Sequence, residues 1–196
     1  PLEITTELAK ERGITVEVES FRKELQKHQD LSRIGSEKKF KGGLGSTGVV
    51  ETRYHTATHL LNTALREVLG THVMQRGSNI TVERMRFDFS HAAKLTDEEK
   101  KKVEDLVNKE IQAALSVSFK EMPKEEAEKM GAVHAFGDKY GDIVKVYTIG
   151  DEKKGIFSRE FCGGPHVTNT SEIGHFKIQK EEAVSAGVRR IRAVIE

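Results

Sequence analysis

Two pairs of potential metal ligands stand out in the sequence, and the members of each pair are four positions apart. His55 and His59 lie in a segment of helical periodicity, where this spacing places both imidazoles on one face, a single turn apart. Cys162 and His166 flank two glycines and a proline, which predict a tight turn that folds both side chains toward one point. Because thiolate and imidazole are preferred zinc ligands, the four residues together predict a tetrahedral zinc site.

The spacing alone leaves the kind of site open. Four protein ligands would make a closed structural site, whereas three ligands and a water would make a catalytic one. On the helix predicted over 52–69, the apolar stripe lies opposite His55 and His59, so we expect both to face solvent, a cleft or a ligand. Without a metal, the alternative is two exposed histidines, a small buried Cys162 and a turn residue at His166.

The elements that must position these ligands follow from the apolar periodicity. Strict alternation over 84–90, for example, puts Met85, Phe87 and Phe89 on one buried face of a strand, and Thr96 begins a capping-box pattern. The expected elements are helices over 1–13, 17–33, 52–69, from Thr96 and over 123–130, a turn at 77–79, and strands near 71–76 and over 84–90, 117–122, 143–149, 176–178 and 188–195. Helices alternating with short strands predict an α+β fold, a two-layer sandwich of a mainly antiparallel sheet with long helices on one face.

The glycine-rich segment 42–48 divides the sequence. It holds four glycines in seven residues and is expected to be a linker. The predicted organisation is therefore a helical appendage over 1–41, the linker, and a zinc-containing domain over 49–196. Because the chain begins at Pro1, we expect it to be a fragment of a longer protein.

Composition excludes several classes of protein. No apolar run approaches the roughly 20 residues of a membrane span, and mean hydropathy is −0.52. The 32 basic and 31 acidic side chains give a net charge of only +1, so nucleic-acid binding by bulk charge is not indicated, although a local basic patch is compatible with it. One cysteine excludes an internal disulfide and fits a reducing compartment such as the cytoplasm.

Beyond these patterns, the sequence resembles the editing domain of alanyl-tRNA synthetases, a family that includes stand-alone editing proteins and the second N-terminal domain of threonyl-tRNA synthetase. The resemblance covers 49–196, and residues 1–34 resemble the segment just upstream of editing in the synthetases. Its motifs are His55–Leu61, Gln75–Ile80 with Arg84–Ser90, Phe157–Val167, Ser171–Gly174 and Ala186–Ile191. Pro165, where Thr is more usual, is a threonyl-like feature.

The sequence departs from the family pattern in one place. Most members have a Gly-rich β-barrel before the first zinc motif, which helps to hold the aminoacyl end of the tRNA, and only Lys38–Val50 stands in that position here. The resemblance therefore implies a short form with a weaker grip on its substrate. The class-defining aminoacylation motifs are absent from this sequence as well.

The resemblance implies hydrolysis of seryl-tRNA(Ala), with glycyl-tRNA(Ala) as a second substrate, at a zinc ion held by His55, His59, Cys162 and His166 as catalytic residues. Its implied partners are the acceptor end of tRNA(Ala) and the rest of a synthetase chain, with no membrane. The residues it suggests for substrate binding are Thr56 for the serine hydroxyl, His72 and Gln75 beside the pocket, and Arg86, Arg189 and Arg190 for tRNA phosphates.

Three alternative functions stay open at this point. One is a non-catalytic tRNA-binding module with a structural zinc, and another is threonyl-type editing of Ser-tRNA(Thr). The third is a zinc hydrolase of another ester or amide, although Thr56 stands where the HExxH motif of metalloproteases has Glu.

Overall fold

The computed structural model describes residues 9–13, 17–24, 26–27, 48–134, 140–153 and 155–196. The chain divides into two compact units, 1–40 and 41–196. In the first unit, residues 9–11, 18–24 and 26–27 are helical, and Gly13 has the positive φ of 65° expected of a helix C-cap. Most of the predicted linker lies outside the described residues, so the boundaries at 41 and 48 stay a prediction.

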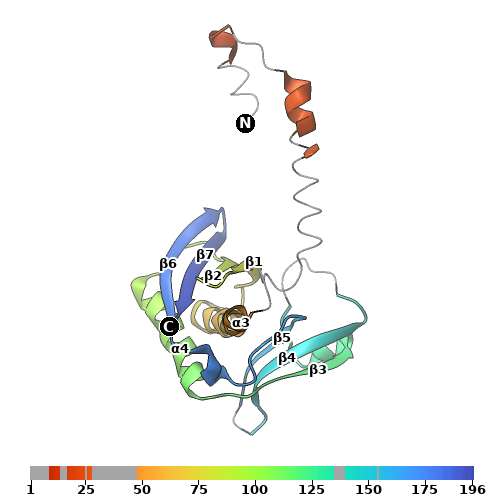
Figure 1. Ribbon diagram of the computed structural model, residues 1–196, viewed down its shortest axis with the longest axis vertical. Helices are drawn as coiled ribbons and strands as arrows, with labels where there is room; N and C mark the ends of the chain where they lie inside the picture. Colours follow the sequence, from red (N-terminus) through yellow and green to blue (C-terminus); the bar gives the residue numbers. More distant parts are fainter. Residues whose placement is uncertain (1–8, 14–16, 25, 28–47, 135–139, 154) are drawn as a thin grey trace. The chain divides into compact units, whose positions relative to one another are not determined.

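A four-stranded antiparallel sheet forms one part of the second unit (Figure 1). Its strands are β1 (Gln75–Ile80), β2 (Met85–Ser90), β6 (Phe176–Ser185) and β7 (Val188–Ile195), in the order β1-β2-β7-β6. Helices α3 (Val49–Leu69) and α4 (Asp97–Gln112) cover one face of it. The apolar faces of strands and helices meet in one core, in which Leu60, Leu61, Phe87, Phe89 and Ile191 are fully buried.

A three-stranded antiparallel sheet forms the other part. It consists of β3 (Val117–Pro123), β4 (Ile143–Asp151) and β5 (Gly155–Phe161) in sequence order, with the short helix α5 (Lys124–Lys129) against it. A second, smaller core lies here, around Met122, Val146 and Phe161. The chain then passes through the 3₁₀ turn η1 (Thr170–Ile173) back to the larger sheet.

The α+β class is confirmed, with the strands shared between two sheets and the long helices on one face of the larger sheet. The buried alternation of Met85, Phe87 and Phe89 is confirmed, as is the capping box, in which Glu99 N donates to Thr96 Oγ1 at 3.1 Å and Thr96 N donates to Glu99 Oε2 at 2.7 Å. No helix within the described ranges is long and apolar enough to cross a membrane.

Two local expectations were wrong. Residues 77–79, predicted as a turn, lie inside β1, and the strand predicted near 71–76 starts only at Gln75. The segment pairs with β2 through a bulge between Gln75 and Gly77, so strand pairing overrides its turn-like composition. The strand β5 was not predicted at all; it runs directly into the Cys162 turn and brings that turn to the site.

Candidate metal centre

Helix α3 is buried on its polar side as well as its apolar side. His55 and His59 are only 2% and 5% exposed, so the alternative of two exposed histidines is wrong. Strand β5 and the turn that follows it cover this side: Asn62 Nδ2 donates to Glu160 Oε1 at 3.0 Å, and Val167 N donates to Thr56 Oγ1 at 3.1 Å. The histidines therefore face the Cys162–His166 turn, as the prediction of a cleft or ligand allowed.

This arrangement brings all four predicted ligands together. Their ligand atoms lie within 4.8 Å of one another, and Cys162 Sγ is 3.4 Å from both His55 Nε2 and His166 Nε2. Zn–S and Zn–N bonds of about 2.3 and 2.0–2.1 Å at tetrahedral angles require an S···N separation of about 3.5 Å. The donor set and its spacing therefore fit a zinc ion.

The outward-facing nitrogens of the three histidines have their own partners, which leaves each Nε2 for the centre. His55 Nδ1 is 3.0 Å from the Pro165 carbonyl, an arrangement in which the ring donates, and His59 Nδ1 is in ion-pair contact with Glu160 Oε2 at 2.9 Å. Carbonyl and carboxylate contacts of this kind orient metal-binding histidines in known sites. The Glu160 carboxylate is 7% exposed and is also held by Asn62.

Thr56 connects the two halves of the site. Its hydroxyl donates to Thr52 O at 3.1 Å, so its oxygen is left to accept from His166 Nδ1 at 3.2 Å and from Val167 N. This residue is fully buried, and its contacts are those of a positioning residue. Its contact with a serine substrate stays a prediction.

The charges of the cluster favour a cation at its centre. Burial alone raises the pKa of the Cys162 thiol, but cationic His59 and hydrogen bonds with three histidines outweigh it and lower that pKa to about 2. Burial also opposes a positive charge on His59, yet the negative charges of Glu160 and Cys162 raise the pKa of His59 to about 10. For His166, burial prevails and lowers the pKa to about 3. Without metal, the proton on His59 therefore balances a thiolate and a carboxylate, a role that a divalent cation would also fill.

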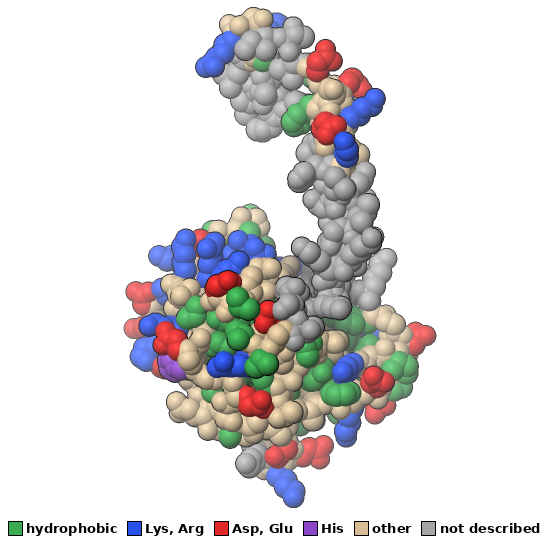
Figure 2. Space-filling view, viewed as in Figure 1, with side chains coloured by type: hydrophobic (Ala, Val, Ile, Leu, Met, Phe, Trp, Pro, Cys, Tyr) green, Lys and Arg blue, Asp and Glu red, His purple; other side chains and the backbone are tan. Residues whose placement is uncertain are grey.

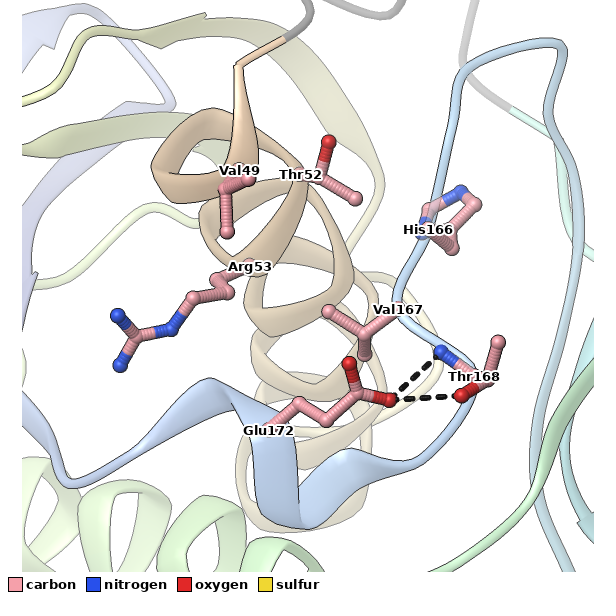
Figure 3. A pocket seen from close by; sticks show the side chains of 7 residues that line it. All are labelled: Val49, Thr52, Arg53, His166, Val167, Thr168 and Glu172. Carbon is pink, nitrogen blue, oxygen red and sulfur yellow. Dashed lines mark hydrogen bonds between the residues drawn. The ribbon is translucent and has the colours of Figure 1, made fainter.

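A pocket of about 400 Å³ opens beside His166 (Figure 3). Figure 3 shows the side chains that line it, Val49, Thr52, Arg53, His166, Val167, Thr168 and Glu172, on the first turns of α3 and on the segment after the Cys162 turn. Arg53 donates to the Ile173 carbonyl at 2.6 and 3.1 Å, and Glu172 accepts from both N and Oγ1 of Thr168. Both charged groups are thus held in place before any ligand arrives.

The other predicted residues lie on the larger sheet and its approach. His72, on the loop before β1, is exposed and contacts His91 at 2.9 Å, and Gln75 begins β1; neither lines the pocket. Arg190 forms a two-pronged ion pair with Asp88 at 2.7 and 2.8 Å, close to Arg86. Arg189 instead pairs with Glu181, whose side chain is 1% exposed. Their roles in substrate binding stay predictions.

Sequence reasoning missed Glu160, Arg53 and Glu172. A signal for Glu160 was present, because Ser158, Glu160 and Cys162 alternate and therefore share one face of an extended segment. Arg53 and Glu172 gave no such signal, since 119 positions separate them and only the fold brings them to one pocket.

Comparison with known proteins identifies relatives of this chain. Residues 144–192 match the family described as "Threonyl and Alanyl tRNA synthetase second additional domain". The alanine--tRNA ligases of Treponema denticola and Treponema pallidum are 59% and 55% identical over all 196 residues, and that of Halalkalibacterium halodurans is 54% identical over 148 residues. The resemblance to the editing region of alanyl-tRNA synthetases is thereby confirmed.

The chain corresponds to only part of each relative. It spans 32% of the length of either Treponema enzyme and 16% of the Halalkalibacterium enzyme, in which 76% of this chain is matched. The Treponema matches extend through Lys38–Val50, so the short connection in place of a barrel fits these relatives.

Proposed function

We propose that this chain, a relative of the editing segment of alanine--tRNA ligases, hydrolyses the ester bond of tRNA(Ala) mischarged with serine, and also with glycine. The observation that supports this proposal most directly is the four-ligand cluster with a pocket beside His166. A synthetase pocket built for alanine cannot strongly reject serine, which adds a hydroxyl, nor exclude the smaller glycine, and a second, hydrolytic site is one way to remove these errors.

In this proposal His55, His59, Cys162 and His166 hold a zinc ion, with Glu160 and Thr56 fixing the orientation of two of the rings. When bound, such an ion supplies Lewis-acid polarisation of a carbonyl or a lowered pKa of water. His166 belongs both to the cluster and to the pocket wall, so a reacting group in the pocket lies next to the ligand set.

The pocket itself suits the end of an aminoacylated RNA. Arg53, near the start of α3, offers a fixed cation for a phosphate, beside the partial positive charge of the helix N-terminus, which the buried Glu51 in the first turn partly offsets. On the opposite side, the carboxylate of Glu172 offers an acceptor for the ammonium group of an amino-acid ester. The two valines leave an apolar surface for a sugar or base.

The proposed partners follow from this substrate. They are the acceptor end of tRNA(Ala) and the rest of a synthetase chain, working in the cytoplasm where tRNA is charged. Because the short connection supplies no barrel, we expect slow hydrolysis by this chain alone, since positioning of reactants can account for about 7–11 kcal/mol of a barrier.

A second candidate is a tRNA-binding module whose zinc is structural. The observation that favours it is the ligand count, because four protein ligands, here two buried and two partly buried, make a closed coordination sphere. Zinc absorption spectroscopy distinguishes the two: four protein ligands with no bound water, both with and without substrate RNA, would favour this candidate.

The deciding experiment is deacylation of Ser-tRNA(Ala), Ala-tRNA(Ala) and Ser-tRNA(Thr) side by side, by this chain and by the same chain joined to a synthetase body. We expect hydrolysis of Ser-tRNA(Ala) with Ala-tRNA(Ala) spared, and loss of activity in Cys162→Ala or with a chelator, restored by added zinc. Equal rates for wild type and Cys162→Ala would refute the proposal, and preference for Ser-tRNA(Thr) would assign threonyl-type editing instead.

A further inference from the structure

The outer face of the four-stranded sheet carries a concentrated positive charge. The helices cover the other face, where Met85, Phe87 and Ile191 point into the core. Alternation and register therefore place the intervening residues together on the outside: Arg86 pairs with Arg192, and Arg192 with Lys180, across three neighbouring strands. Figure 2 shows Lys and Arg side chains gathered on the second unit in the region of these strands.

We define the arginine face as five cations and the two carboxylates among them. Its members are Arg86, Arg190, Arg192, Lys180, Asp88 and Glu182, placed by strand register, and Arg84, which precedes β2 and whose charge acts on Arg86. The net formal charge of this face is +3, against +1 for the whole chain, so the other surfaces together are slightly acidic. The local basic patch that composition alone could not exclude is therefore present.

The cations on this face are not all matched by internal partners. Arg190 donates to Asp88 at 2.7 and 2.8 Å, and Arg192 and Lys180 share Glu182, at 3.0 and 2.6 Å. Arg86 is matched less well: its Nε lies 3.9 Å from Asp88 Oδ1, a carboxylate that Arg190 already engages, and within the described residues neither this Nε nor that of Arg192 makes a hydrogen bond. Burial lowers the pKa of Arg86, and its neighbours Arg190, Arg84 and Arg192 lower it further, against the effect of Asp88. A polyanion bound on this face would relieve the repulsion among these cations.

The chemistry of the face favours an RNA backbone over a protein surface. Guanidinium groups bind phosphate in a planar, two-pronged geometry. On β2, β6 and β7, the described residues include only one large exposed hydrophobic side chain, Val184 near the end of β6, so the face lacks the apolar centre of a typical protein interface. Its strands also direct their aromatic rings, Phe87 and Phe89, inward, which leaves no platform for stacked bases.

We propose that the arginine face docks the phosphate backbone of the tRNA substrate, independently of base sequence and outside the metal centre. The proposal takes its partner from the proposed function, but it concerns binding of uncharged tRNA and not hydrolysis. It is therefore tested even if no ester is cleaved.

The test measures the affinity of the whole chain for an uncharged tRNA(Ala) transcript between 50 and 200 mM salt. The variant is Arg86→Gln/Arg192→Gln, which leaves the Arg190–Asp88 pair intact. The matched control, Lys101→Gln/Lys109→Gln, removes the same charge from α4, where both lysines are exposed and have acidic neighbours. Thermal melting of each protein establishes that it is folded.

Removing one phosphate contact reduces the magnitude of the negative slope of log K against log salt by about 0.7–0.9, so we expect the magnitude to decrease by about 1.4–1.8 for the arginine variant and to change little for the control. Arg86→Lys/Arg192→Lys should retain most of the slope. Equal slopes for the arginine variant and the control would overturn the proposal. A loss of binding to poly-L-glutamate without a loss of binding to tRNA would also overturn it, in favour of an acidic protein partner.

Discussion

The proton on His59 gives a prediction about metal binding that depends on the geometry of the cluster. Zinc can bind His59 only after its Nε2 loses a proton, and the raised pKa of about 10 means that this proton is present throughout the neutral range. Cys162, with its pKa lowered to about 2, is already a thiolate, and His166, with its pKa lowered to about 3, is already neutral. Between pH 7 and 9, the proton to be displaced is therefore that of His59.

The free-energy cost of displacing the proton from His59 follows from the difference between its pKa and the pH of the assay. At pH 7.5 the competition amounts to about 2–3 pH units, or about 3 kcal/mol at roughly 1.4 kcal/mol per unit. The apparent zinc Kd should accordingly fall about tenfold for each unit of pH from 7 to 9. An isolated thiol with the ordinary pKa of about 8.5 would instead give a dependence that levels off within this range.

Glu160→Gln tests the physical cause. The substitution keeps an oxygen for Asn62 but removes the carboxylate that lies 2.9 Å from His59 Nδ1, so only the thiolate still raises the pKa of His59. The pH dependence should then level off at a lower pH than that of the wild type. Glu172→Gln is the matched control, because Glu172 lines the neighbouring pocket without contacting His59.

The assay is competition with a chromophoric chelator at pH 7, 8 and 9, corrected for the chelator's own protonation. A pH dependence of Glu160→Gln that coincides with that of the wild type would refute the reasoning. So would a wild-type Kd that does not vary with pH, because His59 would then hold no proton against zinc.

Three other substitutions or treatments probe the same contacts and the predicted linker. Cys162→Ala should abolish the binding of one zinc ion per chain, measured by elemental analysis, and the rise in melting temperature that zinc gives the wild type; unchanged metal content would contradict the ligand set. Thr56→Val should lower the free energy of unfolding by about 1–3 kcal/mol in urea denaturation, because the buried N–H of Val167 loses its acceptor, whereas Thr56→Ser should retain most of the stability. Limited proteolysis should cut first between Gly42 and Gly48, and protection of that segment would contradict the predicted linker.

The sequence by itself determined the features that depend on local spacing. The four-residue separation in each pair identified the four residues that the structure brings together, because a helical turn and a glycine-proline turn each bring such residues close. The alternation of Met85, Phe87 and Phe89 predicted the buried face of β2. The pattern from Thr96 to Glu99 predicted the start of α4. Both signals are complete within a few residues.

Tertiary structure decided whatever depends on contacts between distant segments. Helical periodicity gave His55 and His59 a polar side, but only the packing of β5 against α3 turned that side into a buried site and placed Glu160 beside His59. The arginines show the same division. Arg189 and Arg190 are adjacent in sequence, yet strand pairing points one toward Glu181 and the other toward Asp88 on the outer face, because successive strand residues face opposite sides and the partner of each is set by register.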